Sequence, residues 1–146
     1  MIIVDPKKCS GCRLCEVNCS LVHEGKFNPR KARLRVRRTI YPKFDITINI
    51  CRQCENAPCQ KICPAAAINR NAKTDVLEVD EKLCSGCMAC VEACPFSALF
   101  THPEKASPFK CDLCHGSPAC TRNCPTKALT LADAANPSRS GEVTIR

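Results

Sequence analysis

Short apolar runs alternate with polar links along this chain of 146 residues, and no apolar run is long. Residues 2–4 are Ile-Ile-Val, which predicts a short β-strand at the start. Arginines alternate with apolar residues over 33–38, and isoleucines alternate with polar residues over 46–50, which predicts two half-buried strands. Tyr41-Pro42-Lys43 lies between them as a turn signal. The pattern therefore predicts a β-hairpin-like insertion, and we expect it to cover neighbouring loops.

Further short strands are expected downstream. Apolar residues on both sides of an Asn-rich polar link predict two strands joined by a turn between residues 64 and 83. Leu99 and Phe100 predict another strand, and residues 128–131 a closing one. The tail, 132–146, has few apolar residues and ends in a short alternation at 143–145. We expect a partner chain to order this tail by accepting it at a sheet edge.

Sixteen cysteines stand in four groups between these strands. The third group reads CSGCMACVEACP over residues 84–95, which is the bacterial ferredoxin spacing C-x2-C-x2-C-x3-C-P that holds a [4Fe–4S] cluster. The first group, over 9–19, repeats the same cysteine spacing but is followed by Ser20 instead of proline. The second, over 51–64, and the fourth, over 111–125, have a longer middle gap of four and five residues. The chain therefore contains an internal fourfold motif.

Metal binding explains these cysteines better than disulfides do. The first residues lack the apolar stretch of a secretory signal, and no run is long enough to span a bilayer, so a cytoplasmic location is expected. In a reducing compartment, Cys-x-x-Cys repeats favour metal sites. Four-thiolate zinc sites are the structural alternative, and they would give a colourless protein. With so few aromatic residues, the apolar core alone is thin, so metal is expected to support folding.

The formal charge of +8 counts every cysteine as a neutral thiol. An oxidised [4Fe–4S] core with four thiolates carries about −2, so four such sites sum to about −8. The basic residues are therefore explained first as compensation for anionic clusters, and no nucleic-acid motif accompanies them. For the arginines over 30–38 two interpretations stay open: a solvated strand face, or a basic patch that docks an acidic partner or offsets cluster charge.

In two-cluster ferredoxins the fourth cysteine of each motif ligates the neighbouring cluster. Groups two and three flank the predicted strand–turn–strand, so we expect them to exchange fourth ligands, which leaves groups one and four to pair. This gives four predicted ligand sets: site I, Cys9, Cys12, Cys15 and Cys124; site II, Cys19, Cys111, Cys114 and Cys120; site III, Cys51, Cys54, Cys59 and Cys94; and site IV, Cys63, Cys84, Cys87 and Cys90. Pairing group one with two and three with four is the alternative.

The expected fold class is α+β, with two ferredoxin-like lobes folded around four [4Fe–4S] clusters and the inner lobe inserted into the outer. The outer lobe comprises residues 1–19 and 111–131, and the inner lobe residues 51–100. The hairpin insertion takes 20–50, a polar connection takes 101–110, and the tail follows from 132. Because four cysteines complete each site, His23, His102 and His115 are expected to be surface or loop residues.

The order of the groups, with phrases such as CRQCENAPC, KCDLC and CPTKAL, resembles the four-cluster iron–sulfur subunits of the dimethyl sulfoxide reductase beta-subunit type. The resemblance covers residues 1 to about 131. All sixteen cysteines are present, which implies four [4Fe–4S] clusters and a ferredoxin-like electron-transport role. In size the chain is most similar to the small iron–sulfur subunits of tungsten- or molybdenum-pterin aldehyde oxidoreductases.

No P-loop, dinucleotide fingerprint or nucleophile–base arrangement accompanies the cysteines, which favours a non-catalytic subunit. The expected function is electron transfer between a catalytic oxidoreductase subunit, such as a pterin-metal enzyme, and a flavin subunit or a soluble ferredoxin, with self-association also open. The related alternatives are a hydrogenase, formate dehydrogenase or carbon monoxide dehydrogenase subunit. A free polyferredoxin shuttle is the third possibility. No nucleic-acid or membrane partner is expected.

Overall fold

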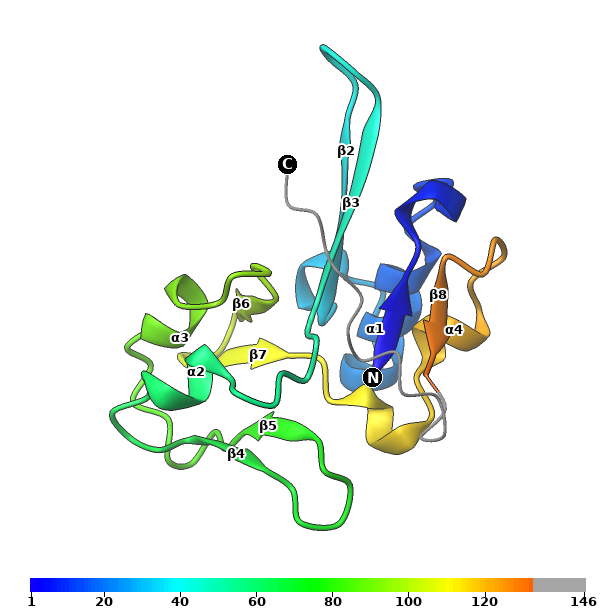
Figure 1. Ribbon diagram of the computed structural model, residues 1–146. Coiled ribbons are helices and arrows are strands. Elements are labelled where there is room, and N and C mark those ends of the chain that lie inside the picture. The colour runs from blue at the N-terminus through cyan, green and yellow to red at the C-terminus, as the bar shows by residue number, and fades with distance from the viewer. Residues whose placement is uncertain (133–146) are drawn as a thin grey trace.

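The computed structural model describes residues 1–132 (Figure 1). Its elements are short, as the brief apolar runs predicted. In chain order they are β1 (Ile2–Val4), η1 (Pro6–Lys8), α1 (Leu14–Glu24), η2 (Pro29–Lys31), β2 (Leu34–Thr39), β3 (Asp45–Ile50), α2 (Pro58–Lys61), β4 (Ile68–Arg70), β5 (Leu77–Val79), α3 (Ala89–Glu92), β6 (Leu99–Thr101), β7 (Pro108–Lys110), η3 (Leu113–Gly116), α4 (Ala119–Arg122) and β8 (Leu129–Leu131).

The strands pair into two-stranded antiparallel sheets: β1 with β8, β2 with β3, β4 with β5, and β6 with β7. The predicted proximity of the first and closing strands is confirmed, because Ile3 lies opposite Thr130 in the β1–β8 ladder. The predicted strand–turn–strand before the third cysteine group is also confirmed as β4 and β5. The chain is thus α+β and ferredoxin-like. The insertion of one lobe into the other stays a prediction.

The hairpin of β2 and β3 matches its prediction, with Leu34 opposite Ile50 at one end and Thr39 opposite Asp45 at the other. Only the half next to the strand ends Leu34 and Ile50 packs into the body, whereas the other half projects away from it (Figure 1). Residues 37–45 are all exposed. The expectation that the insertion covers neighbouring loops therefore holds for its base and is wrong for its tip.

Helix α1 is longer than the four-residue helices that lie within the other cysteine groups. Ser20 explains the difference, since it replaces the proline that ends the motif elsewhere and leaves the helix free to continue. Its side chain is fully buried, donates a hydrogen bond to the carbonyl of Val17 at 2.9 Å, and accepts one from the amide of Asn28 at 3.1 Å. The helix ends at Gly25, which adopts a left-handed conformation.

The expectation of a mere polar connection over residues 101–110 is wrong. This stretch contains β7, which pairs with β6 and gives the strand of Leu99 and Phe100 its antiparallel partner. Pro108 opens the strand, where its missing N–H costs little, and is fully buried, as is Lys110. The mostly polar composition of this stretch gave no strand signal in the sequence. The lysine of the strand is nevertheless buried, because it has hydrogen-bond partners.

Two hydrophobic cores support the cysteine groups. One joins the base of the hairpin with β1 and β8, and its largest side chains include Ile2, Leu34, Ile50 and Leu129. The other lies among α2, α3, β4 and β5 around Ile68 and Leu77. Within residues 1–132, no helix has the length and apolar character needed to cross a membrane. The predicted ordering of the tail falls outside the described residues.

Candidate metal centres

The first and last cysteine groups meet at site I. Cys9, Cys12, Cys15 and Cys124 line one small cavity, although Cys124 is more than 100 residues away in the chain. Gly11 makes the turn between the first two cysteines, with a φ of +70°. A Cβ at this position would lie 2.6 Å from the side chain of Arg38, so glycine is needed both for the turn and for the close approach of the hairpin.

Site IV has the same construction in the other half of the molecule. Cys63, Cys84, Cys87 and Cys90 line a second small cavity. Its floor is apolar, since Ile68 and Val79 of the β4–β5 hairpin and Pro108 also line it. Three of these cysteines come from the third group and one from the second, as predicted for exchanged fourth ligands.

At sites II and III, the proximity of the four cysteines shows in the effect of each thiol on the pKa of its neighbours. At site II burial raises the pKa of Cys120, and the nearby Cys111, Cys19 and Cys114 raise it further. At site III burial raises the pKa values of Cys54 and Cys59, and both are raised further by Cys51 and Cys94. The structure therefore brings together the four members of each predicted set.

Cysteines of one set also affect the pKa values of cysteines in the next set. Cys15 of site I raises the pKa of Cys120 in site II. Cys111 of site II, whose pKa is raised to about 12 mainly by burial, is also affected by Cys51 of site III. Cys59 of site III contributes to the raised pKa of Cys90 in site IV. Packing agrees with this order, because one hydrophobic core contains cysteines of sites I, II and III and the other contains cysteines of sites III and IV. The four sets thus lie in series, from I through II and III to IV, and each end set has one exposed cysteine, Cys12 or Cys87.

The donor set fits a cationic iron–sulfur core. All sixteen cysteines are free thiols within the described part of the chain, and burial opposes the ionisation of several of them. Burial raises the pKa of Cys15 to about 12, and that of Cys19 to about 11. Buried thiols in such proximity become thiolates only when a metal supplies compensating positive charge. The arrangement therefore fits metal–thiolate bonds better than free or catalytic cysteines.

Backbone amides point at one or two sulfurs of each set. They include the amide of Gly11 to Cys9 at 3.4 Å, of Arg33 to Cys19 at 3.2 Å, of Gln53 to Cys51 at 3.4 Å, and of Ala67 to Cys63 at 3.3 Å. Hydrogen bonds to cluster sulfurs stabilise the more negative, reduced form and so raise the reduction potential. These loops are built to hold and tune anionic sulfur.

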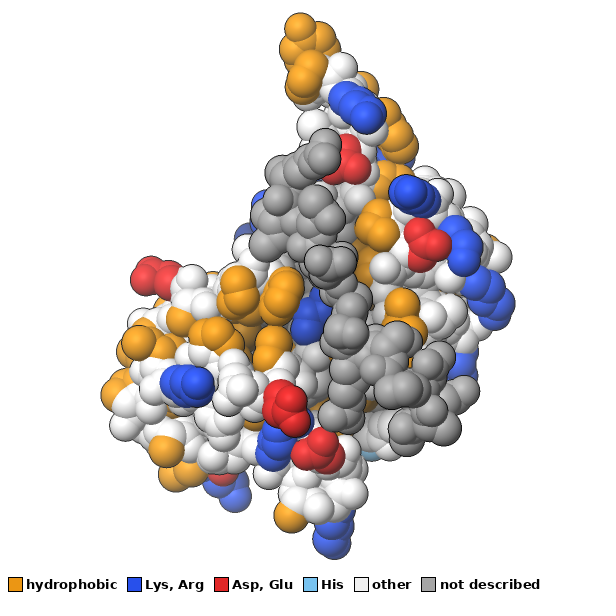
Figure 2. All heavy atoms as spheres, in the orientation of Figure 1, with side chains coloured by type: hydrophobic (Ala, Val, Ile, Leu, Met, Phe, Trp, Pro, Cys, Tyr) orange, Lys and Arg blue, Asp and Glu red, His pale blue; other side chains and the backbone are white. Residues whose placement is uncertain are grey.

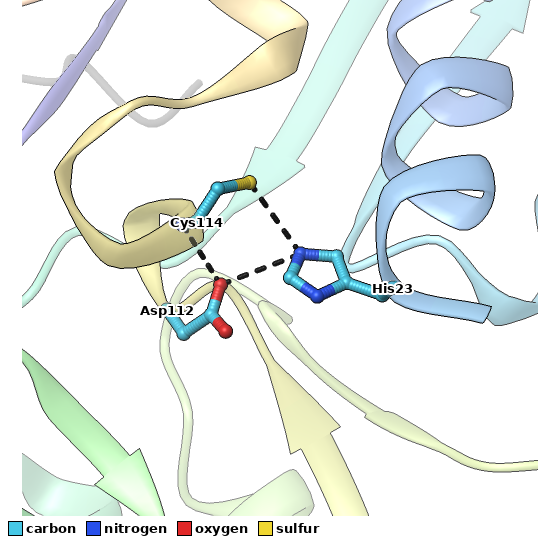
Figure 3. A group of neighbouring side chains, drawn as sticks. All are labelled: His23, Asp112 and Cys114. Atoms are coloured by element: carbon cyan, nitrogen blue, oxygen red, sulfur yellow. Dashed lines mark hydrogen bonds and ion pairs between the residues drawn. The ribbon is translucent and has the colours of Figure 1, made fainter. Parts of the chain in front are cut away.

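A side-chain nitrogen also lies near one of the cysteine sulfurs of site II. Nε2 of His23 lies 3.4 Å from Sγ of Cys114 and 3.4 Å from Oδ1 of Asp112 (Figure 3). Asp112 in turn accepts a hydrogen bond from Arg33 at 2.5 Å and from the amide of Cys114 at 3.0 Å. Burial, and then the charge of Arg33, lower the pKa of His23. The network holds the imidazole of His23 against a predicted ligand.

The expectation of surface or loop histidines is therefore wrong for His23 and right for the other two, since His102 lies in the loop after β6, although it is buried there, and His115 is exposed. The His23 side chain, on helix α1, is 9% exposed, and His102 is buried against the ring of Phe109. Nδ1 of His102 accepts a hydrogen bond from the amide of Glu104 at 3.1 Å. Only His115 is exposed. The complete cysteine count argued against histidine ligands, but it said nothing about burial, which long-range packing decides.

The arginines of the strand divide into two kinds: the solvated face is confirmed only for the exposed ones, and the docking patch stays a prediction. Arg33 bonds Asp112, and the guanidinium of Arg35 lies 4.4 Å from the centre of the Phe100 ring, so both serve the interior. Arg37 and Arg38 are exposed on the projecting part of the hairpin. The sequence also gave no sign that Lys110 and Glu16 are buried, since isolated charged residues are usually exposed.

Fold and donor set together define an iron–sulfur protein of ferredoxin type. A family model described as a 4Fe-4S dicluster domain matches residues 42–134, and one described as a 4Fe-4S binding domain matches residues 6–24. The chain belongs to the 4Fe-4S dicluster domain family. It is therefore a [4Fe–4S] protein, and its sixteen cysteines fit four clusters.

Similar proteins are named for electron transfer. The chain is 43% identical over 112 residues to the polyferredoxin-like subunit of the aliphatic sulfonate oxidoreductase of Pyrococcus furiosus, a match that covers 77% of this chain and 64% of that protein. It is 39% identical over 119 residues to the putative electron transport protein YsaA of Escherichia coli, and 38% identical over 134 residues to HydN of the same organism, with 77% of this chain and 74% of each relative covered.

A solved structure has the same fold. It is the active site complex BamBC of benzoyl coenzyme A reductase with 1,5-dienoyl-CoA, which matches with a TM-score of 0.51 and 26% identity over 100% of this chain and 82% of that chain. The proteins that this chain resembles are thus electron-transfer proteins and parts of oxidoreductase complexes.

Proposed function

We propose that this chain is a non-catalytic electron-transfer subunit that holds four [4Fe–4S] clusters in sites I to IV. It conducts electrons between the cofactor of a catalytic subunit and a flavin subunit or soluble carrier. The observation that carries this proposal is the packing of the predicted cysteine sets in two hydrophobic cores, sites I to III in one and sites III and IV in the other, with one exposed cysteine in each end set. Each cluster, when bound, accepts and releases one electron.

The residues of the chain have three tasks in this role. The cysteines hold the metal as thiolates, in sets shared between sequence-distant groups. Backbone amides and His23 donate hydrogen bonds to sulfur and so raise the reduction potential of the site they contact. The surrounding apolar side chains exclude water from sites II and III, where Cys19, Cys51, Cys59, Cys111 and Cys120 are all buried.

The catalytic partner is proposed to be a tungsten- or molybdenum-pterin aldehyde oxidoreductase-like subunit, which makes this chain a small member of the dimethyl sulfoxide reductase beta-subunit type. Support comes from the cysteine phrases and from two comparisons. One is with a subunit of an aliphatic sulfonate oxidoreductase, and the other is with the BamBC active site complex. A hydrogenase, formate dehydrogenase or carbon monoxide dehydrogenase remains the alternative partner.

Anaerobic affinity purification from the native host tests the proposal. We expect about sixteen irons and sixteen acid-labile sulfides per chain, from four cubane sites, and a co-purifying subunit that contains a redox cofactor. A fully loaded preparation with half that iron would contradict four clusters. A fully loaded chain that purifies alone and still reduces several acceptors would instead indicate a free polyferredoxin shuttle, which the names of YsaA and HydN also allow.

A further inference from the structure

The far end of the β2–β3 hairpin exposes large apolar side chains that the fold does not use. Ile40 is 81% exposed, Tyr41 87% and Phe44 61%. Figure 2 shows hydrophobic side chains covering the end of the projection, with a basic side chain beside them. Apolar patches that stay exposed on a protein often mark interaction sites, so an exposed apolar cluster on a protruding element indicates such a site. Tyr, Phe and Arg are also enriched at the centres of protein interfaces.

The alternation along β3 shows where the internal role of the hairpin ends. Ile46, Ile48 and Ile50 are buried, and Leu34 and Val36 of β2, which lie opposite Ile50 and Ile48, are buried too. Beyond this point Arg37 and Arg38 are exposed, and the apolar side chains at the tip have no hydrophobic core to pack against. An isolated two-stranded ribbon is marginally stable in water. The exposed apolar side chains at its tip do not stabilise it, so they are better explained by a role in binding.

The base of the hairpin is fixed to site I. Oε1 of Glu16, a buried residue next to Cys15, accepts a hydrogen bond from the amide of Val36 at 2.7 Å. Arg13 donates to the carbonyl of Val36 at 3.0 Å, so both backbone groups of this strand residue bond to the cysteine loop. Val36 and Ile48 also line the cavity of site I. A partner bound to the hairpin therefore lies beside site I, the end of the series where Cys12 is exposed.

The charges near the tip define the partner. Arg37, Arg38 and Lys43 are exposed against a single acidic residue, Asp45, so the projection is basic. A second copy of this chain offers the same basic surface and is disfavoured by like-charge repulsion. An acidic rim around an apolar groove is complementary to both features of the hairpin.

We infer that the tip of the β2–β3 hairpin inserts into an apolar, acid-rimmed groove on the redox-cofactor-bearing subunit. It thereby docks that subunit at site I rather than at site IV. This inference rests on the proposed function and adds to it the surface that recognises the partner and the end of the series at which it binds.

The test combines affinity with site-specific cross-linking, using the iron-loaded full chain and the subunit identified by co-purification. The tip variant contains Ile40→Ser, Tyr41→Ser and Phe44→Ser. Its matched control contains Phe27→Ser, Ile62→Ser and Leu83→Ser, which are 71%, 50% and 54% exposed at other places. We expect the tip variant to bind the subunit at least tenfold more weakly, and the control to bind within twofold of wild type. Arg37→Glu with Lys43→Glu should also weaken binding, because it places acidic groups against an acidic rim.

Cross-linking identifies the occupant. A photo-cross-linking amino acid in place of Tyr41 should join the cofactor-bearing subunit, at a peptide that borders an apolar groove with acidic residues. The same amino acid in place of Lys73, an exposed turn residue near β4 and β5, should not. Unchanged affinity of the tip variant, or a Tyr41 cross-link to a second copy of this chain, would overturn the docking inference while leaving the proposed function intact. A wild-type chain that binds no redox subunit would overturn both.

Discussion

Nε2 of His23 contacts Sγ of Cys114 across two segments that are 91 residues apart in the chain. The other neighbour of this nitrogen, the carboxylate of Asp112, can only accept a hydrogen bond, and so can a metal-bound thiolate. A proton on Nε2 can therefore be donated to the sulfur of Cys114 once that cysteine binds a metal. This contact gives site II a tuning group that the cysteine spacing alone does not reveal.

His23→Phe should lower the reduction potential of site II. The aromatic ring preserves volume but removes the N–H that favours the more negative reduced form. A hydrogen bond worth about 1 kcal/mol corresponds to roughly 40 mV for one electron. The measurement is a potentiometric titration followed by electron paramagnetic resonance, with His115→Phe as the exposed control. His23→Gln should retain part of the effect because it retains an N–H donor. Equal potentials in all four proteins would contradict a tuning role.

Cys124→Ser should perturb site I, although its other ligands lie at the opposite end of the sequence. Cys124 lines the same cavity as Cys9 and Cys12, so a weaker oxygen ligand there should make one cluster labile or shift its spectrum. Site II should be unaffected, because its predicted fourth ligand is Cys19. Cys19→Ser is the matched variant, with the reverse expectation. Loss of the site II signal in Cys124→Ser would mean that Cys124 binds the cluster of its own group, which contradicts the exchange of fourth ligands, and loss of the site IV signal would support the alternative pairing of the cysteine groups.

Spacing and alternation predicted much of this molecule because both are short-range signals. The grouping of Cys9 with Cys15, and the alternation over Ile46–Ile50, depend on residues that are close in sequence. Burial of His102 and Lys110 depends on segments that meet only in the folded chain, so composition assigned them to the surface or to a polar link. The β7 strand was missed for the same reason, since three residues with a proline carry almost no strand signal.

Removal of iron should unfold the chain. The two apolar cores contain many of the cysteines themselves, including Cys19, Cys51 and Cys111, so loss of the metal leaves thiols where bonds had joined distant segments. We expect chelation after oxidative cluster loss to abolish the circular dichroism of the short helices and strands, and iron with sulfide under reducing conditions to restore it. An apo chain with the native spectrum would show that packing alone holds the fold.

Lys110 joins the two halves of the molecule, and its charge reaches site III. Its buried ammonium donates hydrogen bonds to the carbonyl of Leu77 and, at 3.2 Å, to the carbonyl of Cys111. Burial and Cys51 raise the pKa values of Cys54 and Cys59, and Lys110 opposes that rise. A positive charge that favours thiolate should likewise favour the more negative reduced form of the site.

Lys110→Gln should therefore lower the potential of site III by tens of millivolts, on the order of 1 kcal/mol for one electron, and lower that of site II less. Lys110→Met should do the same and also lower the unfolding temperature, since the buried carbonyl of Leu77 then loses its partner at a cost of about 1–3 kcal/mol. Glutamine keeps a donor without the charge, so comparison of the two variants separates electrostatics from hydrogen bonding. Lys73→Met, on an exposed turn, serves as the control. If Lys110→Gln keeps the wild-type potential at site III, the lysine acts only in packing, and the origin of the potential has to be sought in the amide hydrogen bonds to sulfur.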